Sequence, residues 1–171
     1  MSGVYSLWLV PNRETKAYRR LSETIGELAA AHPDAPEFEP HVTVLGGIRG
    51  DQDRITKRAQ HLAEERRPLE LTFTTLQCST TKHQCVFLLV QPTRELLSVH
   101  QAAVQRFDTD GGMYVPHLSL IYSDMSIDDR FTVVESIGIG SLPGGVDADE
   151  LAVIETTGSV PEWDTVATYE L

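Results

Sequence analysis

The chain of 171 residues has the length of one ordinary domain, and its 41% apolar and 23% charged residues are typical of a soluble globular protein. Its formal net charge of −11 would repel a long polyanion, which argues against nonspecific nucleic-acid binding. No apolar run approaches the roughly 18 residues that span a membrane, and the N-terminus lacks the features of a signal peptide. We therefore expect a cytoplasmic protein without membrane contact.

Hydrophobic periodicity predicts a mixture of strands and amphipathic helices along the whole chain. In chain order we expect a strand at 4–10, a helix at 12–32, a strand at 40–46, a helix at 51–67, an antiparallel hairpin of 69–78 and 85–92, a helix at 93–107, a strand at 113–123, a helix at 126–137, and strands at 147–157 and 166–171. No linker divides the chain, and the order lacks a regular βαβ rhythm. These patterns predict an α+β fold with antiparallel sheets in a single domain, residues 1–171.

Two segments share the pattern proline, histidine, apolar, hydroxyl, apolar: PHVTV at 40–44 and PHLSL at 116–120. Successive side chains of a strand point to opposite faces, so His41 and Thr43 share one face and the two valines take the core face. The two histidines are 117 minus 41, or 76, residues apart, which is close to half the chain. Two copies on predicted strands favour a functional motif over chance.

If the two halves are related by pseudo-two-fold symmetry, His41, Thr43, His117 and Ser119 point into one shared cleft. A histidine pair with unperturbed pKa values near ~6.5 can hold one neutral and one protonated ring, as concerted general acid and base catalysis requires. Hydroxyl groups can donate hydrogen bonds to phosphoryl oxygens whose charge grows in the transition state. Displacement at a phosphodiester by water fits these groups, and we expect neither a metal nor a cofactor.

The HVTV and HLSL tetrads resemble the H-x-[ST]-x pair of the two-histidine (2H) phosphoesterases, and the flanking segments resemble the cyclic phosphodiesterases of that superfamily. Those enzymes open nucleoside 2',3'-cyclic phosphates and ADP-ribose 1'',2''-cyclic phosphate. The resemblance implies a bilobal fold, with two pseudo-symmetric lobes of antiparallel sheet around a central cleft and helices outside. The segments that carry it span most of the chain, and they are YSLWLVP at 5–11, PHVTV at 40–44, QCVFLLV at 84–90 and PHLSLIYSD at 116–124.

By this resemblance His41 and His117 are the catalytic residues, and Thr43 and Ser119 bind phosphate. Tyr122 matches the family tyrosine that follows the second tetrad and helps hold phosphate or water. The family commonly has Tyr-Gly-Asp there, whereas this chain has Tyr-Ser-Asp, so we expect an altered loop. We interpret His117 as the base that activates water, because Tyr122 lies nearby on the same strand, and His41 as the acid.

The remaining candidates leave alternatives open. Trp8 shares a strand face with Ser6 and either stacks on a nucleobase in the cleft, as the family pattern suggests, or belongs to the core. The glycine pair 46–47 either ends the strand or lets a phosphate approach backbone N–H groups. Cys78 and Cys85 are predicted to be free thiols, with a hairpin disulfide as the alternative in a secreted protein. Four further histidines lack ligand spacing and are predicted to lie at the surface: His32, His61, His83 and His100.

The leading interpretation is a monomeric, metal-independent phosphodiesterase that acts on small 2',3'-cyclic phosphates, with the 2'-phosphate as product by analogy with the family. The expected partner is a small-molecule cyclic phosphate, with no long nucleic acid and no membrane. An RNA-end processing enzyme resembling the 2'-5' RNA ligase branch is disfavoured by the small number of basic residues, 14 in all. A noncatalytic nucleotide-binding module is disfavoured because both histidines and both hydroxyl residues are present.

Overall fold

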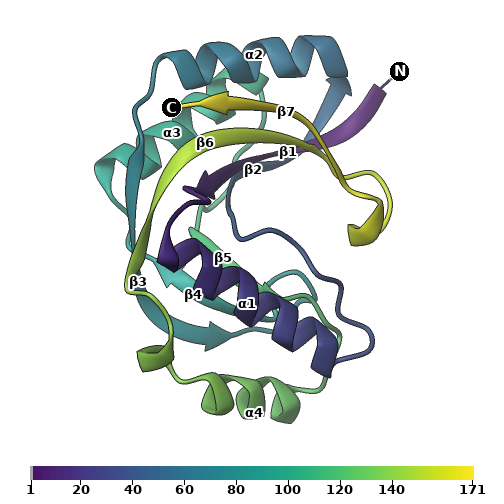
Figure 1. The fold of residues 1–171 in the computed structure, drawn as a ribbon. Helices are drawn as coiled ribbons and strands as arrows, with labels where there is room; N and C mark the ends of the chain where they lie inside the picture. The colour runs from purple at the N-terminus through teal and green to yellow at the C-terminus, as the bar shows by residue number, and fades with distance from the viewer. Residues whose placement is uncertain (1) are drawn as a thin grey trace.

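Seven strands, four α-helices and two short 3₁₀ turns make up residues 2–171, the part of the chain that a computed structural model describes (Figure 1). The strands are β1 Ser2–Pro11, β2 Val42–Asp51, β3 Leu69–Cys78, β4 Val86–Val90, β5 His117–Ile121, β6 Gly145–Glu155 and β7 Asp164–Glu170. The helices are α1 Lys16–Ala31, α2 Gln52–Glu64, α3 Arg94–Phe107 and α4 Ile127–Ile137, and the 3₁₀ turns are η1 Ile139–Ser141 and η2 Val160–Glu162. Each strand and α-helix expected from the sequence is confirmed.

Each α-helix begins at a side-chain oxygen that accepts a hydrogen bond from a backbone N–H of the first turn, which would otherwise lack a partner. The four capping residues are Thr15, Asp51, Thr93 and the predicted Ser126. One face of each helix is buried, because apolar residues recur at helical spacing. In α3 the buried face includes Leu96, Val99, Ala103 and Phe107, as the sequence predicts. None of the helices within residues 2–171 combines the length and the apolar character needed to cross a bilayer.

All strand pairs are antiparallel and belong to one sheet in the order β1-β2-β5-β4-β3-β6-β7, with a further pairing between β1 and β6. The expectation of separate sheets is therefore wrong. The reason lies in β6, which pairs with β3 through residues 145–148 and with β1 through residues 148–155. Strand β6 thus connects β3 to β1, so the pairings form a closed circuit through β1, β2, β5, β4, β3 and β6.

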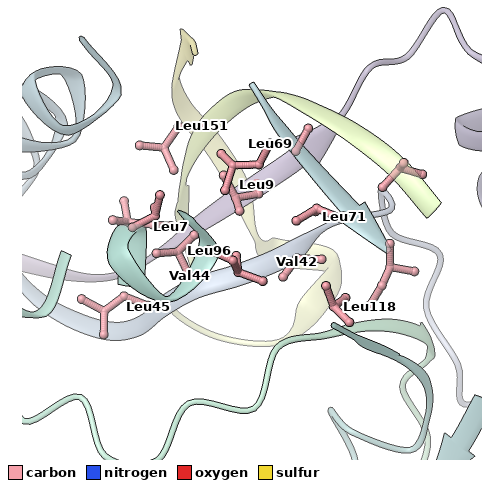
Figure 2. Packing of buried hydrophobic residues seen from close by; sticks show 14 of the residues in the cluster. Leu7, Leu9, Val42, Val44, Leu45, Leu69, Leu71, Leu96, Leu118 and Leu151 are labelled. Carbon is pink, nitrogen blue, oxygen red and sulfur yellow. The ribbon is translucent and has the colours of Figure 1, made fainter. Parts of the chain in front are cut away.

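The helices divide between the two ends of this mixed α/β fold. Helix α2 contacts β1, β2, β6 and β7, and α3 contacts β2, whereas α1 contacts β5 and α4 contacts β3 and β4 (Figure 1). A core of aliphatic side chains fills the space between helices and strands, including Leu7 and Leu9 from β1, Val42 and Val44 from β2, and Leu96 from α3 (Figure 2). Removing such side chains from water supplies the main favourable contribution to folding.

The hairpin of β3 and β4 contains both cysteines, and neither forms a disulfide. Cys85 is fully buried, and burial raises the pKa of its thiol. A buried thiol with a raised pKa stays protonated and is therefore a poor nucleophile. The prediction of free thiols is confirmed.

A buried arginine ties the β3–β4 turn to the segment that follows β5. The side chain of Arg130 in α4 is 3% exposed, and its guanidinium donates only to backbone carbonyl oxygens, at 2.6 to 3.2 Å. The accepting carbonyls belong to Ser79, Thr81, Ser123 and Met125. Ser123 is buried and Ser79 and Met125 are partly buried, so carbonyl oxygens left there without a donor would cost free energy.

Arg130→Met should lower the free energy of unfolding by about 3 kcal/mol, because it keeps most of the side-chain volume but leaves carbonyl oxygens without donors. Urea denaturation of the two proteins measures the difference. Arg106→Met is the matched control, because its ion pair with Glu65 at 2.8 Å lies at the surface, where solvent screens it. Equal effects of the two substitutions would contradict a structural role for Arg130.

Candidate active site

The two motif segments lie side by side because β2 and β5 pair through a single residue pair, Val42 with Leu118. Continuing this antiparallel register by one residue in each direction places His41 beside Ser119 and Thr43 beside His117. Val42 and Leu118 are fully buried in the core. The face opposite the core therefore carries both histidines and both hydroxyls, as strand alternation predicts.

Each motif histidine is fixed by the same hydrogen bond. Nδ1 of His41 lies 2.7 Å from the carbonyl oxygen of Glu39, and Nδ1 of His117 lies 2.9 Å from that of Val115. A carbonyl oxygen can only accept, so Nδ1 carries the proton in both rings. The Nε2 atom of each neutral ring is left with a lone pair, and it is this nitrogen that can take up or deliver a proton.

A cavity of about 180 Å³, here called the catalytic cavity, collects the residues that the sequence singled out. Its lining contains no Asp, Glu, Lys or Arg side chain, so histidines and hydroxyls provide its polar chemistry. The lining residues are Ser6, Trp8, His41, Thr43, His83, His117, Ser119, Tyr122 and Trp163. All six predicted site residues are among them.

Burial lowers the pKa of both motif histidines. His41 is 4% exposed, and burial, together with repulsion from His117, lowers its pKa to about 4. His117 is only half-buried, and its pKa is lowered, mainly by burial. His41 is therefore neutral in the ligand-free protein near pH 7, and a bound anion is needed to favour its protonated form.

Tyr122 contacts His41, which corrects one expectation. The tyrosine hydroxyl lies 3.3 Å from Nε2 of His41, although Tyr122 directly follows β5, the strand that begins at His117. Because Nδ1 of His41 holds the proton, the hydroxyl donates to Nε2. Burial raises the pKa of Tyr122, so its hydroxyl stays protonated and remains a donor. The proximity argument that assigned the base to His117 is therefore wrong.

Trp8 lies against His41 rather than open to a ligand. The two rings are stacked, with centroids 3.4 Å apart and planes 8° apart. Only 6% of Trp8 is exposed, and it also contacts the edge of Trp163. Of the two interpretations left open for Trp8, stacking on a nucleobase is disfavoured, because the indole face toward the cavity is already covered.

The two motif hydroxyls differ in their present partners. Ser119 Oγ donates to the carbonyl oxygen of His83 at 2.9 Å, so this hydroxyl must give up that bond before it can donate to a phosphate. No hydrogen bond to Thr43 Oγ1 is found within residues 2–171. Thr43 is therefore the hydroxyl that is free to receive an anion.

The loop before β2 is held at both ends. Arg13 forms ion pairs with Glu39 at 2.6 Å and with Glu150 at 3.0 Å, and the carbonyl of Glu39 is the one that orients His41. At the other end, Asp34 accepts from the hydroxyl of Ser123 at 2.8 Å. Ser123 is the residue at which the family commonly has glycine. The loop after Tyr122 is thus altered by a side-chain bond, and Tyr122 still lines the catalytic cavity.

Three lining residues were not found from the sequence as site residues: Ser6, His83 and Trp163. His83 is exposed, as predicted, but it also stacks on Trp163, with centroids 5.7 Å apart. Trp163 reaches the cavity from the connection between β6 and β7, far from both motifs in sequence. The alternation of Ser6 with Trp8 on β1 was the one signal that could have identified Ser6.

Two expectations about the surroundings are wrong. His100 is not at the surface but 9% exposed, because its Nδ1 bonds the carbonyl oxygen of Val44 at 2.8 Å and its ring stacks on Tyr114. Gly46 and Gly47 do not end the strand, since β2 continues to Asp51. They lie instead at a register shift between β1 and β2, where Gly47 has φ +70°. Such a bulge bends the strand and leaves an extra residue outside the ladder.

No group of three or more His, Cys, Asp or Glu side chains that could share a metal ion is found in residues 2–171. The histidines of the catalytic cavity are therefore not accompanied by carboxylates or thiolates. Their nearest polar neighbours are hydroxyls and backbone carbonyls.

Comparison with known proteins identifies the family of the chain. The family model described as cyclic phosphodiesterase-like protein matches residues 1–171. The chain is 27% identical to a cyclic phosphodiesterase from Arabidopsis thaliana over 176 residues, covering 98% of this chain and 95% of the relative. It is 26% identical to a 2',3'-cyclic-nucleotide 3'-phosphodiesterase from Yarrowia lipolytica over 208 residues, covering 94% and 96%.

Among solved structures, the fold is similar to that of E. coli LigT complexed with ATP. The TM-score is 0.61 at 14% identity, with 99% of this chain and 98% of LigT covered. The chain thus belongs to the cyclic phosphodiesterase-like family and is a phosphodiesterase.

The unfolding free energy should fall by up to roughly 3 kcal/mol through His41 alone as pH decreases from about 6.5 to about 4. The pKa of His41 is lowered in the folded state, so the unfolded chain binds this proton first and acid favours unfolding. Urea denaturation at several pH values, for wild type and His41→Gln, isolates the effect in the difference between the two curves. Parallel curves would show that His41 is not buried in its neutral form.

Proposed function

We propose that this protein hydrolyses nucleoside 2',3'-cyclic phosphates without a metal ion. We propose that it hydrolyses ADP-ribose 1'',2''-cyclic phosphate by the same mechanism. The observation that carries this proposal is the presence of His41 and His117 in one cavity, each held by the same Nδ1 hydrogen bond. The matched tautomers leave two Nε2 atoms for the two proton transfers that hydrolysis requires. One chain supplies every residue of this cavity, which supports action as a monomer.

In the proposed reaction, the oxygen of a water molecule attacks phosphorus while its proton passes to Nε2 of the neutral histidine. The bond from phosphorus to O3' breaks, and O3' takes the proton from Nε2 of the protonated histidine. The products are a nucleoside 2'-phosphate and a free 3'-hydroxyl, which is the outcome that the name of the Yarrowia relative indicates. Thr43 and Ser119 donate hydrogen bonds to the phosphoryl oxygens.

Burial distinguishes the two histidines. The strongly lowered pKa of His41 favours it as the neutral ring that accepts the proton of water. His117 is more accessible and is the ring that more readily holds a proton for the leaving oxygen. Tyr122 supports this assignment, because its hydroxyl lies 3.3 Å from Nε2 of His41 and can orient the attacking water beside that nitrogen.

The charges around the cavity favour a small substrate over RNA. Lys82, the basic side chain on the β3–β4 turn, is paired with Asp124 at 3.8 Å. Asp110 and Asp124 lie on either side of the second motif and would repel an extended phosphate backbone. A mononucleotide brings one cyclic phosphate with a single charge, which a protonated histidine and hydroxyls can hold. RNA-end processing and 2'-5' RNA ligation therefore remain the less favoured function.

His41→Ala and His117→Ala should each lower kcat on 2',3'-cyclic nucleotides by about 10²- to 10⁴-fold, because each removes one of the two proton transfers. Rates are measured with the cyclic nucleotide in excess, and circular dichroism checks that each variant is folded. Wild-type activity should show a bell-shaped pH dependence and should persist in EDTA. Turnover that is lost in EDTA and restored by a divalent ion would contradict the metal-free reaction.

Thr43→Ala and Ser119→Ala provide the matched comparison, since each removes one neutral donor. Thr43→Ala should have the larger effect, because Ser119 already donates to the carbonyl of His83. A folded His41→Ala or His117→Ala variant with near wild-type turnover would refute the two-histidine mechanism. A wild-type protein that binds the cyclic nucleotide without hydrolysing it would instead be a binding module.

Substrate size gives an independent test. The value of kcat/KM on mononucleotide 2',3'-cyclic phosphates should change little with salt, whereas each phosphate contact to a longer single strand would add a salt slope of roughly −0.7. Mononucleotides and oligonucleotides that end in a cyclic phosphate are compared at two salt concentrations. A preference for oligonucleotides with a steep loss on adding salt would favour RNA-end processing.

A further inference from the structure

A second cavity, of about 340 Å³, adjoins the catalytic cavity and is larger than it. The two share Thr43 and His117, so a phosphate held by these residues lies at their boundary. We call it the His100 cavity, and its other lining residues are Val44, Leu45, Gly46, Gly47, His100, Thr109, Asp110, Gly111 and Tyr114. The bulge at the glycine pair forms one wall, where backbone rather than side chains borders the space.

His100 brings an unused acceptor to this cavity. It is more than nine-tenths buried, and its Nδ1 donates to the carbonyl oxygen of Val44. Nε2 therefore carries a lone pair, and no hydrogen bond to it is found within the described chain. Gly111 packs so closely that an added Cβ would lie 3.2 Å from this nitrogen. An acceptor that borders a cavity and has no partner in the protein is available to a ligand or to a water molecule.

Two side chains of the loop after α3 add to this set. Thr109 Oγ1 is buried and has no hydrogen-bond partner, and Asp110 contributes a carboxylate. Together with Nε2 of His100 they form a cluster in which acceptors outnumber obligate donors. Such a cluster is complementary to N–H groups of a ligand.

The catalytic cavity leaves little room for a nucleobase. Its volume of about 180 Å³ lies below the roughly 300 Å³ at which pockets for drug-sized ligands begin. The aromatic rings around it also stack on other rings: Trp8 stacks on His41, Phe38 stacks on Tyr122 with centroids 4.0 Å apart, and His83 stacks on Trp163. A further adjoining cavity shares Trp8 and Trp163 but neither motif histidine. The His100 cavity is the neighbour that a ribose held at His117 can enter.

We propose that the His100 cavity binds the nucleobase and selects bases that carry an exocyclic amino group. This proposal rests on the proposed function for its substrate and adds the specificity. Cytosine, adenine and guanine offer an amino donor, whereas uracil has the O4 acceptor where cytosine has its N4 amino group. Asp110 and His100 would accept hydrogen bonds from the amino group, and the same acceptors would face O4 of uracil without a proton between them.

Cytidine and uridine 2',3'-cyclic phosphates are the matched substrate pair, because they differ at this position and are nearly equal in size. Wild-type kcat/KM should favour cytidine by about tenfold, as expected for a hydrogen bond to a charged acceptor. Asp110→Asn should reduce the preference to about twofold, because the amide can donate to O4 as well as accept. Thr109→Val should weaken binding of both substrates without loss of stability, since its hydroxyl has no protein partner.

Asp108→Asn is the control, because it removes a neighbouring carboxylate that does not line the cavity, and asparagine tolerates the left-handed conformation there, φ 52°. It should keep the full cytidine preference. Calorimetric dissociation constants for cytidine and uridine 3'-phosphates give a readout independent of turnover. Equal binding and turnover of the two bases, or an unchanged preference in Asp110→Asn, would overturn the base-site proposal while leaving the hydrolase intact. A cytidine preference in binding with no turnover of any cyclic nucleotide would instead overturn the proposed function alone.

Discussion

The chemistry of the site depends on one repeated hydrogen bond, from Nδ1 of a histidine to the carbonyl oxygen two residues earlier. It occurs at His41 and again at His117, and in both cases a proline lies between the carbonyl and the histidine. The proline ring fixes φ, which restricts the backbone between the two groups. The proline of the motif thus helps to hold the imidazole ring in position against the carbonyl oxygen. Because Nδ1 of each ring holds the proton, Nε2 of each histidine is an acceptor, and Nε2 of His41 accepts from the hydroxyl of Tyr122.

The sheet then brings these two local arrangements together. Strand β6 pairs with β1 and with β3, and β2 meets β5 through Val42 and Leu118 alone. A single residue pair gives little stability, so the pairings of β2 with β1 and of β5 with β4 must hold the two motif strands in place. The carbonyl bonds of Arg130 add to this from outside the sheet, by fixing the turn that carries His83 and the segment that contains Tyr122.

Strand alternation and helical periodicity were sufficient to predict the elements and the shared face of His41, Thr43, His117 and Ser119, because those patterns depend on local geometry. The contact between Tyr122 and His41 depends on the separation of two strands and was assigned to the wrong histidine. Trp163 reaches the cavity from a distant connection, which no local pattern reveals. The burial of His100 depends on a carbonyl of β2 that becomes available only when α3 packs on the sheet.

The indole of Trp8, stacked on His41 at 3.4 Å, also bears on a conflict within the site. Burial opposes a positive charge on His41, yet the proposed reaction requires this ring to carry a proton for part of each cycle. The face of an indole is the negative side of its quadrupole and attracts a cation, by about 0.5 to 2 kcal/mol depending on solvent exposure. Trp8 would therefore act only while His41 is charged, as a neutral counterpart to the imidazolium that adds no fixed negative charge to repel the phosphate.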